Sequence, residues 1–571
     1  MPQDAFTLKY LCAELSELFI EGKVNRIIQP SNDEVVLTIY TGFSTKKLLL
    51  CVNPAMPRIG VISEEKDSPL TAPNFCMLLR KHLLSSTVKN IELVGFDRIV
   101  KIDFISSAEF SDSTLKTLYV ELMGRYSNII LTENGKILGG NRGINMFDNG
   151  VRPLIVGRQY VFPPVGEKKL PNDKEIVEVF RSFDHQNFAE DICKNIQGIA
   201  LSTAKEIQRK FIIKHGENTD NFSEKLYNFL NEFLYNTKSI PCVLKQNLEV
   251  KDVEVFPYET MDGERCFFDK LYLAEDYYFT EKKLTKDFSA KRERLNSVAN
   301  TLLRKTKKKI TLINARKKEA QDAEKNRIYG ELIIANIYRF KGGEKECILD
   351  NYYDNTEVKI TLDSRLSASK NAENYYKKYN KQKRTLLAIE PQLIQIEKEK
   401  AYFESLIDEI ELCETLEDLS YIKQEMESEG LIYDKQKSGA RKKSKESFCR
   451  EYEYKGFRIK AGRNNAQNEK LTFTAMKEDI WVHAKDYHSS HVIIQTNGKK
   501  VEEEVIKVAC EICAYYSKGR EGDKVEIVYT ARKNVKKPPK SKLGFCTYEN
   551  FKSVIVKPQK HEQLLKEDKK G

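Results

Sequence analysis

Side chains able to form several hydrogen bonds each are concentrated between residues 452 and 494. The run GRNNAQN carries a guanidinium group and four carboxamides, which makes five residues candidates for contacting RNA: Arg463, Asn464, Asn465, Gln467 and Asn468. Amide and guanidinium groups suit the polar, negatively charged and irregular surface of folded RNA. Runs with β-type alternation flank this stretch, so a solvated hairpin turn remains the alternative interpretation.

The only tryptophan of the chain, Trp481, follows this run. Alternation between Asp479 and Ile494 places Trp481 and His483 on one face, and we include both, with His491, among the RNA-contacting candidates. These two histidines and His488 could also form a metal site with a nearby aspartate. A folded hairpin with polar edges explains them without a metal, and we expect neither a metal nor a cofactor.

Basic side chains gather in three places along the chain, although the net charge of +11 is modest for 571 residues. Two of these places are the stretch 435–450 and the lysine-rich tail 552–571. The third offers a candidate phosphate-contacting edge made of Arg532, Lys533, Lys536 and Lys537. A solvated basic loop explains the third place equally well.

The cysteine pattern favours a reducing compartment. Twelve cysteines are scattered through the chain, and the one close pair, Cys510 and Cys513, lies in an apolar pattern of helical period. A second such pair, which a structural zinc site requires, is missing, so we predict that both are core residues. No apolar run reaches the ~18 residues of a membrane span, and the N-terminus does not resemble a secretory signal. We therefore expect a cytoplasmic protein that does not bind a membrane.

The length predicts several domains, at ~100–200 residues each, and the element pattern predicts a multidomain α+β architecture. In the first part we expect a helix at Leu8–Phe19, strands at Val35–Tyr40 and Lys47–Val52, and a hairpin turn at Asn134-Gly135. The expected divisions are an α+β domain at 1–170, a helix-hairpin-helix domain at 171–275, a coiled coil at 280–434 with a β tip at 340–362, a basic linker at 435–447 and a C-terminal α+β domain at 448–571.

A long helical arm is predicted by a seven-residue repeat. Ile389, Ile396, Phe403 and Ile410 occupy equivalent positions of this repeat. An earlier helix, from about Lys291 to Tyr338, would pair with it in the antiparallel sense. An arm of this kind is a spacer and is poorly suited to hold an active site.

Residues 196–199 form a glycine-containing turn between two helical segments. In a helix-hairpin-helix, the turn amides and the next helix N-terminus favour phosphate, so Gly198 and Lys205 become RNA-binding candidates. The pattern is short, and a plain helical hairpin explains it as well.

With these segments in order, the chain resembles the NFACT family along essentially its whole length. The motifs that carry the resemblance are FCMLLRKHL, GFDRIVKI, ELMGRYSNIIL, LDSRLSASKNAENYYKKY, GFRIKAGRNNAQNEKLT, DIWVHAKDYHSSHVII and NVKKPPKSKLGFCTY. The resemblance implies an N-terminal domain with a glycosylase-like fold and a C-terminal RNA-binding domain. The length favours the bacterial branch of the family.

The resemblance also implies a function that the composition does not supply. Bacterial members bind a stalled large ribosomal subunit that carries peptidyl-tRNA and a nascent chain, recruit alanyl-tRNA and support template-free alanine tailing for degradation. The coiled coil reaches toward the stalk base, and a small RNA-binding protein of the RqcP type assists. The ribosomal peptidyl-transferase centre makes the bond, so we expect no catalytic residues, no enzyme activity and a monomeric chain.

The site residues that the resemblance implies are the tRNA-handling pair Asp97 and Arg98, together with Glu121, Leu122, Met123 and Arg125. From the residues alone, Asp97 and Arg98 could form a local ion pair. Strand alternation places Glu121 and Met123 on one face and Leu122 in the core. This chain departs from the family pattern at Leu122, where isoleucine is usual, and at Tyr126, where histidine is usual. It has Ser489 where the family motif has glycine.

Three other functions remain as alternatives. DNA glycosylases of similar N-terminal fold use an N-terminal proline, and this chain begins Met1-Pro2, but Gln3 replaces the acidic residue they need. Some relatives carry a fibronectin-binding label, so a fibronectin-binding surface protein is the second alternative. The third is a coiled-coil scaffold that binds rRNA without specificity.

Overall fold

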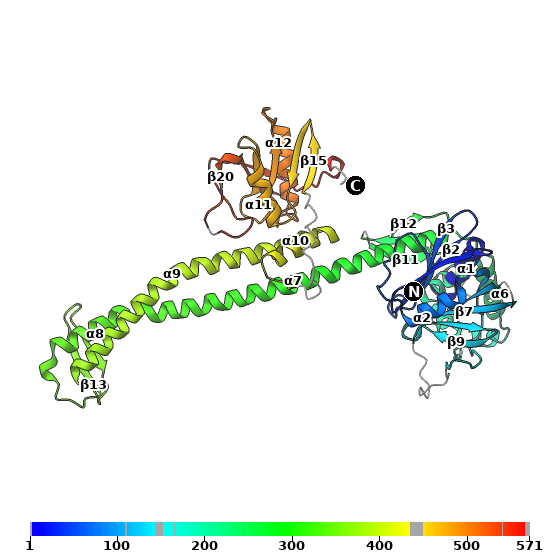
Figure 1. The fold of residues 1–571 in the computed structure, drawn as a ribbon, viewed down its shortest axis with the longest axis horizontal. Coiled ribbons are helices and arrows are strands. Elements are labelled where there is room, and N and C mark those ends of the chain that lie inside the picture. The colour runs from blue at the N-terminus through cyan, green and yellow to red at the C-terminus, as the bar shows by residue number, and fades with distance from the viewer. Residues whose placement is uncertain are drawn as a thin grey trace. The chain divides into compact units, whose positions relative to one another are not determined.

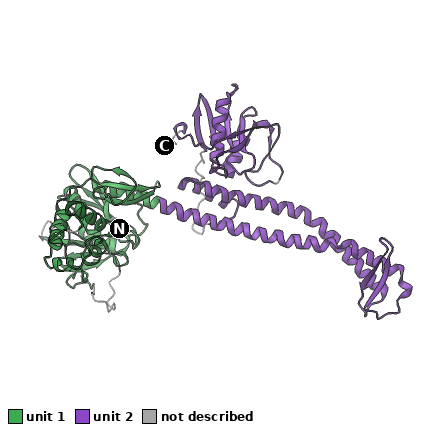
Figure 2. Cartoon of the chain, turned by 180° about the vertical axis from the view of Figure 1, so that it is seen from behind, with its two compact units in different colours: residues 1–284 green, residues 285–571 purple. Residues whose placement is uncertain are grey.

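The structure is a computed structural model of the chain. It describes residues 3–565 apart from 109–110, 143–151, 153, 165, 218, 248, 434–448 and 540. Pro2, the predicted basic linker 435–447 and the last residues of the lysine-rich tail therefore lie outside the described residues. The chain divides into two compact units, residues 1–284 and residues 285–571 (Figure 2).

The first unit is built on a nine-stranded antiparallel sheet of order β4-β3-β2-β1-β5-β6-β7-β8-β9 (Figure 1). Its strands are β1 (Lys23–Ser31), β2 (Glu34–Tyr40), β3 (Thr45–Cys51), β4 (Arg58–Ile62), β5 (Thr87–Leu93), β6 (Ile99–Ala108), β7 (Ser111–Glu121), β8 (Asn128–Glu133) and β9 (Lys136–Gly140). Helices α1 (Ala5–Phe19) and α2 (Asn74–Leu83) pack on one face and share its core. The predicted strands at 35–40 and 47–52 are confirmed as β2 and β3.

Local sequence explains where several of these elements begin and turn. Helix α1 starts three residues before the predicted Leu8 because the Asp4 side chain caps it, accepting a hydrogen bond from the Thr7 amide at 2.8 Å. The predicted turn at Asn134-Gly135 is confirmed, with φ of 49° and 79°, values that match a type I′ hairpin.

A helical segment and a small sheet complete the first unit and pack into the same core. The helices are α3 (Ile176–Phe180), α4 (Ala189–Asn195), α5 (Leu201–His215) and α6 (Phe222–Asn236). The sheet has the order β11-β10-β12, with β10 (Cys242–Gln246), β11 (Glu249–Glu254) and β12 (Glu264–Phe267). The predicted turn at 196–199 joins α4 to α5, so the helical hairpin is confirmed.

The arm is a pair of long helices, α7 (Leu271–Gln321) and α9 (Ala368–Leu412). Between them lie α8 (Ala323–Ala335) and the hairpin of β13 (Glu346–Asn351) and β14 (Thr356–Thr361), which forms the predicted tip. The heptad seam is confirmed, since Ile389, Ile396, Phe403 and Ile410 are all buried. The first helix begins at Leu271, about twenty residues before the predicted start. A shorter helix, α10 (Leu416–Ser428), follows α9.

The C-terminal part of the second unit is a six-stranded sheet of order β15-β16-β18-β17-β19-β22. Its strands are β15 (Arg450–Tyr454), β16 (Phe457–Ala461), β17 (Ile480–Ala484), β18 (Val492–Gln495), β19 (Val525–Ala531) and β22 (Lys552–Val556), and β20 (Val535–Lys536) pairs separately with β21 (Thr547–Tyr548). Helix α12 (Glu503–Tyr515) packs on this sheet and buries Cys510 and Cys513 completely, as predicted.

The solvated hairpin turn proposed for the amide-rich run is wrong. Strand β16 pairs with β15 and β18, and the run turns instead into helix α11 (Asn465–Thr474). Asn464 is the N-cap, and its side chain accepts a hydrogen bond from the Gln467 amide at 2.9 Å. The Asn-x-x-Gln spacing is therefore a helix-start signal of the capping-box type. The predicted hairpin of 479–494 is confirmed as β17 and β18.

Candidate nucleic-acid interface

One cavity of the first unit brings together sequence positions that lie far apart. It has a volume of about 860 Å³ and is lined by, among others, Asp97, Arg98, Met123, Gln197 and Gly198. Asp97 and Arg98 lie between β5 and β6, Met123 follows β7, and Gln197 and Gly198 belong to the turn between α4 and α5. The cavity thus joins residues from three separate parts of the sequence, each of which sequence analysis selected.

Asp97 is held in place from two directions. One carboxylate oxygen accepts a hydrogen bond from the Arg98 amide at 2.7 Å, and the other accepts one from the Gln197 side chain at 2.9 Å. The Arg98 carbonyl accepts a hydrogen bond from the Leu122 amide at 2.9 Å, which fixes this loop to the end of β7. A guanidinium and an oriented carboxylate at one cavity can bind a phosphate and a base edge, respectively.

Gly198 fixes the helical hairpin against this loop. Its φ is 77°, and an added Cβ would lie 2.2 Å from the Phe96 carbonyl oxygen and 2.5 Å from the Ala5 Cβ. Only glycine fits both the left-handed backbone and the close approach. The Gly198 carbonyl also accepts a hydrogen bond from the Ala5 amide at 2.8 Å. This contact is what places Gln197 within reach of Asp97.

Asp4 joins the N-termini of two helices. Oδ1 accepts from the Thr7 amide at the start of α1, and Oδ2 accepts from the Ala200 amide at the start of α5 at 3.1 Å and from the Thr203 hydroxyl at 2.7 Å. Asp4 is only 4% exposed. Because a carboxylate already occupies the Ala200 amide, a phosphate at this hairpin would have to use the neighbouring groups of the cavity.

Two residues of the predicted 121–123 site do not line the cavity. Glu121 is buried, and its carboxylate pairs with Arg152 through two hydrogen bonds of 2.6 and 3.1 Å and accepts a third from the Tyr160 hydroxyl at 2.7 Å. Burial, with Glu121 alongside, raises the pKa of Tyr160. Leu122 is 1% exposed and belongs to the main core, as the strand alternation predicted. Met123 packs on the same small apolar cluster as Tyr160, the partner of Glu121, so Glu121 and Met123 lie on the side opposite Leu122, although only Met123 lines the cavity.

Two further candidates of the first unit are exposed but separate from one another. Arg125 lies beyond the end of β7, with its guanidinium carbon 4.7 Å from the Tyr126 ring centroid. Tyr126 is 67% exposed and lines the same cavity as Arg98. Lys205 lines a different cavity, of about 410 Å³, so the structure does not bring it together with Gly198.

In the second unit, the amide-rich run contacts helix α10. The Asn464 side chain donates to the Tyr421 carbonyl at 3.1 Å, and the Ala466 amide donates to the Glu425 carboxylate at 3.1 Å. Arg463 and Arg450 both pair with Asp418, at 3.1 and 3.0 Å. Asn464, Asn465, Gln467 and Asn468 are between 2% and 6% exposed. In the structure described these amides are bonded within the protein, and their contact with RNA stays a prediction.

Buried ionisable groups accompany this contact. Burial is the first cause that raises the pKa of Glu425 to about 7, and burial also raises the pKa of Glu409 well above its ordinary value. Burial lowers the pKa of His488 to about 4, and its Nε2 lies 3.9 Å from Glu409. Desolvation thus shifts all three groups toward their neutral forms. Asp418 behaves differently: burial opposes its charge, but Arg450 and Arg463 lower its pKa.

The remaining candidates of the second unit differ in exposure. Trp481 is fully buried and stacks on His483, with ring centroids 5.4 Å apart, and His491 is 3% exposed. Arg532 donates to the carbonyls of Thr472 and Phe473 at the end of α11. Three lysines are exposed: Lys533, Lys536, which pairs with Glu549 at 3.4 Å, and Lys537, which pairs with Glu469 at 2.7 Å.

Neither a metal-binding cluster nor a membrane-spanning helix is found in the described part of the chain. Among these residues, no group of three or more histidine, cysteine, aspartate or glutamate side chains is arranged to hold a metal ion. No helix within the described ranges is both long and apolar enough to cross a membrane.

Comparison with protein families matches nearly the whole chain. Residues 4–446 match the NFACT N-terminal and middle domains, and residues 447–544 match the NFACT protein RNA binding domain. The chain belongs to the NFACT family. The cavity around Asp97 and Arg98 therefore lies within the NFACT N-terminal region, and the run that contacts α10 lies within the RNA-binding domain.

Individual relatives extend over the same length. The Rqc2 homolog RqcH of Bacillus subtilis is 31% identical over 562 residues, which cover 95% of this chain and 96% of that protein. The Rqc2 homolog RqcH of Streptococcus pneumoniae is 30% identical over 572 residues, with 98% of each chain covered. The solved N-terminal part of the Streptococcus suis fibronectin/fibrinogen-binding protein is 24% identical, covering 48% of this chain and 98% of that one. Its TM-score of 0.42 is too low to support a conclusion about this chain.

Sequence analysis missed three groups of this interface. Gln197 was not selected, although it lies directly before the selected Gly198, and only the folded turn shows that it reaches Asp97. Asp4 was missed as a second helix cap, because its partners at 200–203 are remote in sequence. Asp418 and Glu425 were missed as partners of the amide-rich run, although the capping spacing of Asn464 and Gln467 was readable.

The Glu121–Arg152 pair predicts a structural effect of mutation. We expect Glu121→Gln to lower the free energy of unfolding by about 3 kcal/mol, because it leaves a buried guanidinium without its counter-charge. Chemical denaturation of the full chain measures this. Glu92→Gln is the control, because its partner Lys101 is 2.9 Å away in an exposed pair, and about 0–1 kcal/mol is expected. An unchanged stability in Glu121→Gln combined with a loss of RNA binding would contradict the structural role.

The raised pKa of Glu425 predicts a pH dependence. A buried acid whose folded pKa is raised contributes stability that is fully present below its ordinary pKa of 4.5 and is lost as pH rises through about 7. The melting temperature of the second unit should therefore fall between pH 5.5 and 8. Glu425→Gln, which is neutral throughout, should reduce this fall, whereas Glu411→Gln at an exposed position of α9 should not. Equal pH profiles for wild type and Glu425→Gln would refute the assignment.

Proposed function

We propose that this protein is a ribosome-associated quality control factor that handles tRNA. It binds stalled large ribosomal subunits that carry peptidyl-tRNA, recruits alanyl-tRNA and directs template-free addition of alanine to the nascent chain. Membership of the NFACT family and similarity to RqcH proteins over nearly the full length support this proposal.

One observation carries the tRNA-handling part. Asp97, Arg98, Met123 and the 197–198 turn line a single cavity, although they come from three separate parts of the sequence. The cavity of about 860 Å³ is large enough for a nucleotide. Arg98 supplies a permanent positive charge there, and Asp97 is oriented by Gln197 to accept a hydrogen bond from a base amine.

The arm suits a positioning role. Helix α9 has 45 residues, which corresponds to ~68 Å at ~1.5 Å per residue. A spacer of this length is long enough to reach the base of the ribosomal stalk. In this proposal the chain acts as a monomer, a small RNA-binding protein of the RqcP type assists it, and the ribosome makes the peptide bond.

Replacing both residues of the pair, Asp97→Ala with Arg98→Ala, tests this proposal. The double variant should remain folded and associated with large subunits on sucrose gradients, because neither side chain belongs to the core. It should lose alanine tails on stalled nascent chains, measured by mass spectrometry of their C-termini, because the tRNA contact is removed.

Lys214→Ala with Glu232→Ala is the matched control, since it removes an exposed pair at 2.7 Å elsewhere in the same unit. This control should tail normally. Persistent tailing in the Asp97/Arg98 variant would show that the cavity does not handle tRNA. In that case the chain would fit better as a coiled-coil scaffold that binds rRNA without specificity.

A further inference from the structure

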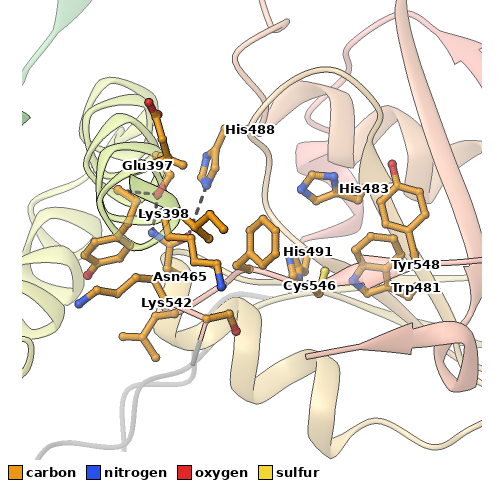
Figure 3. A pocket seen from close by; sticks show the side chains of 18 of the residues that line it. Glu397, Lys398, Asn465, Trp481, His483, His488, His491, Lys542, Cys546 and Tyr548 are labelled. Carbon is orange, nitrogen blue, oxygen red and sulfur yellow. Dashed lines mark hydrogen bonds between the residues drawn. The ribbon is translucent and has the colours of Figure 1, made fainter. Parts of the chain in front are cut away.

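A second cavity lies within the second unit, between helix α9 and the six-stranded sheet domain (Figure 3). Its volume is about 670 Å³, within the ~300–1,000 Å³ range typical of small-molecule sites. The sheet domain contributes Trp481, His483, His491, Cys546 and Tyr548, which lie together on one side of the cavity. The tRNA-handling proposal does not use this cavity.

The wall formed by the sheet domain is made largely of flat rings. The ring centroids of Trp481 and His483 are 5.4 Å apart, with only 2° between the ring planes, and those of Trp481 and Tyr548 are 5.2 Å apart. His491 meets Trp481 edge-on, with centroids 5.3 Å apart. Tyr548 is only partly buried and is tilted 43° from Trp481, so a planar heteroaromatic ligand can stack on it, as unpaired bases do on aromatic side chains in RNA-binding proteins.

Three polar atoms that line the cavity have no partner among the described residues: Trp481 Nε1, His488 Nδ1 and Ser541 Oγ. The Trp481 ring is fully buried, yet its Nε1–H has no hydrogen-bond acceptor there. An unsatisfied buried donor is destabilising, so it is uncommon without a ligand or water. His488, which also lines the cavity, has an unpartnered buried Nδ1.

The tautomer of His483 makes its Nε2 atom a hydrogen-bond acceptor. Its Nδ1 lies 2.6 Å from the Ala484 carbonyl oxygen, which can only accept, so Nδ1 carries the proton. Burial lowers the pKa of His483 to about 4, so the ring is neutral at neutral pH. The Nε2 atom is therefore an acceptor, and within the described ranges it has no donor. Trp481 and His483 together offer one donor and one acceptor.

Two lysines contribute positive charge to the cavity. Lys398 of α9 and Lys542 of the 541–548 segment line it, as does Glu397, which pairs with Lys400 at 3.5 Å (Figure 3). Lys542 pairs with Glu429 at 3.1 Å, whereas Lys398 has no ion-pair partner among the described residues. A cation beside an aromatic cavity is the arrangement that single-stranded nucleic acids bind, with the base on the rings and the phosphate on the lysine.

We infer that this cavity binds one unstacked base of a single-stranded RNA segment. The base stacks on the Tyr548 ring, which is tilted 43° from Trp481, so that its edge accepts from Trp481 Nε1 and donates to His483 Nε2, and its phosphate lies near Lys398. This inference rests on the proposed function in one respect, namely that the chain binds RNA. It adds the kind of nucleotide that the RNA-binding domain takes and the place where it binds.

Tryptophan fluorescence tests this directly, because Trp481 is the only tryptophan of the chain. The full-length protein is titrated with a short single-stranded oligoribonucleotide, with the same strand in a duplex and with a short apolar peptide. Saturable quenching is expected with the single strand and not with the duplex or the peptide. Fluorescence anisotropy of the labelled oligonucleotide measures total binding in parallel.

Two variants with matched controls locate the effect. Cys546→Phe fills the cavity and should abolish the quenching, whereas Cys546→Ser should retain it. Lys398→Gln should weaken single-strand binding at least threefold and lower the salt slope by about one phosphate contact. Lys383→Gln, on the same helix but outside the cavity, should change neither quantity.

The outcomes separate this inference from the proposed function. Oligonucleotide binding that leaves Trp481 fluorescence unchanged, and that neither Cys546→Phe nor Lys398→Gln affects, would overturn the base-binding site while RNA binding stands. Quenching by the peptide in place of the oligonucleotide would also overturn it and assign the cavity to a polypeptide. Absence of any RNA binding by the wild type would contradict the proposed function as well.

Discussion

The Asp4 carboxylate is the contact on which the candidate tRNA site depends. It accepts hydrogen bonds at the N-termini of both α1 and α5, and the partial positive charge of two helix dipoles favours a carboxylate there. The hydrogen bonds of Asp4, together with the one from the Ala5 amide to the Gly198 carbonyl, hold the helical hairpin next to the loop that carries Asp97 and Arg98. The site is thus assembled by groups that do not themselves have to contact RNA.

In the second unit, by contrast, residues of types that often bind RNA form hydrogen bonds and ion pairs within the protein. The amide-rich run caps α11 and bonds to α10, and Asp418 holds two arginines at 3.0 and 3.1 Å. Side-chain chemistry suited to RNA is equally suited to the polar groups of a helix surface. In the neighbouring aromatic cavity, by contrast, Trp481 Nε1 and His488 Nδ1 are buried without a partner among the described residues.

Periodicity predicted much of the fold. The heptad seam, the strands β2 and β3 and the buried pair Cys510 and Cys513 are confirmed because burial depends on which face a residue occupies, and that face follows from the repeat. The same argument correctly placed Leu122 in the core. The start of α11 could have been predicted from the Asn-x-x-Gln spacing, but the flanking strands suggested a hairpin.

The candidate sites were less predictable, since they depend on contacts between remote residues. Sequence alone does not show that Glu121 pairs with Arg152 and Tyr160, nor that Gln197 reaches Asp97 across a glycine too crowded for a side chain. The aromatic cavity joins α9 to β17, to His488 and His491 before β18, and to the 541–548 segment, and no spacing rule connects these positions. Residue types identified useful candidates, and the fold determines which of them lie next to one another.

Sequencing the RNA crosslinked to the protein in cells with stalled ribosomes tests the central claim most directly. The account predicts enrichment of tRNA and large-subunit rRNA over total RNA, with tRNA crosslinks on the peptide that contains Asp97 and Arg98. Recovery of neither RNA above its cellular abundance would contradict the account.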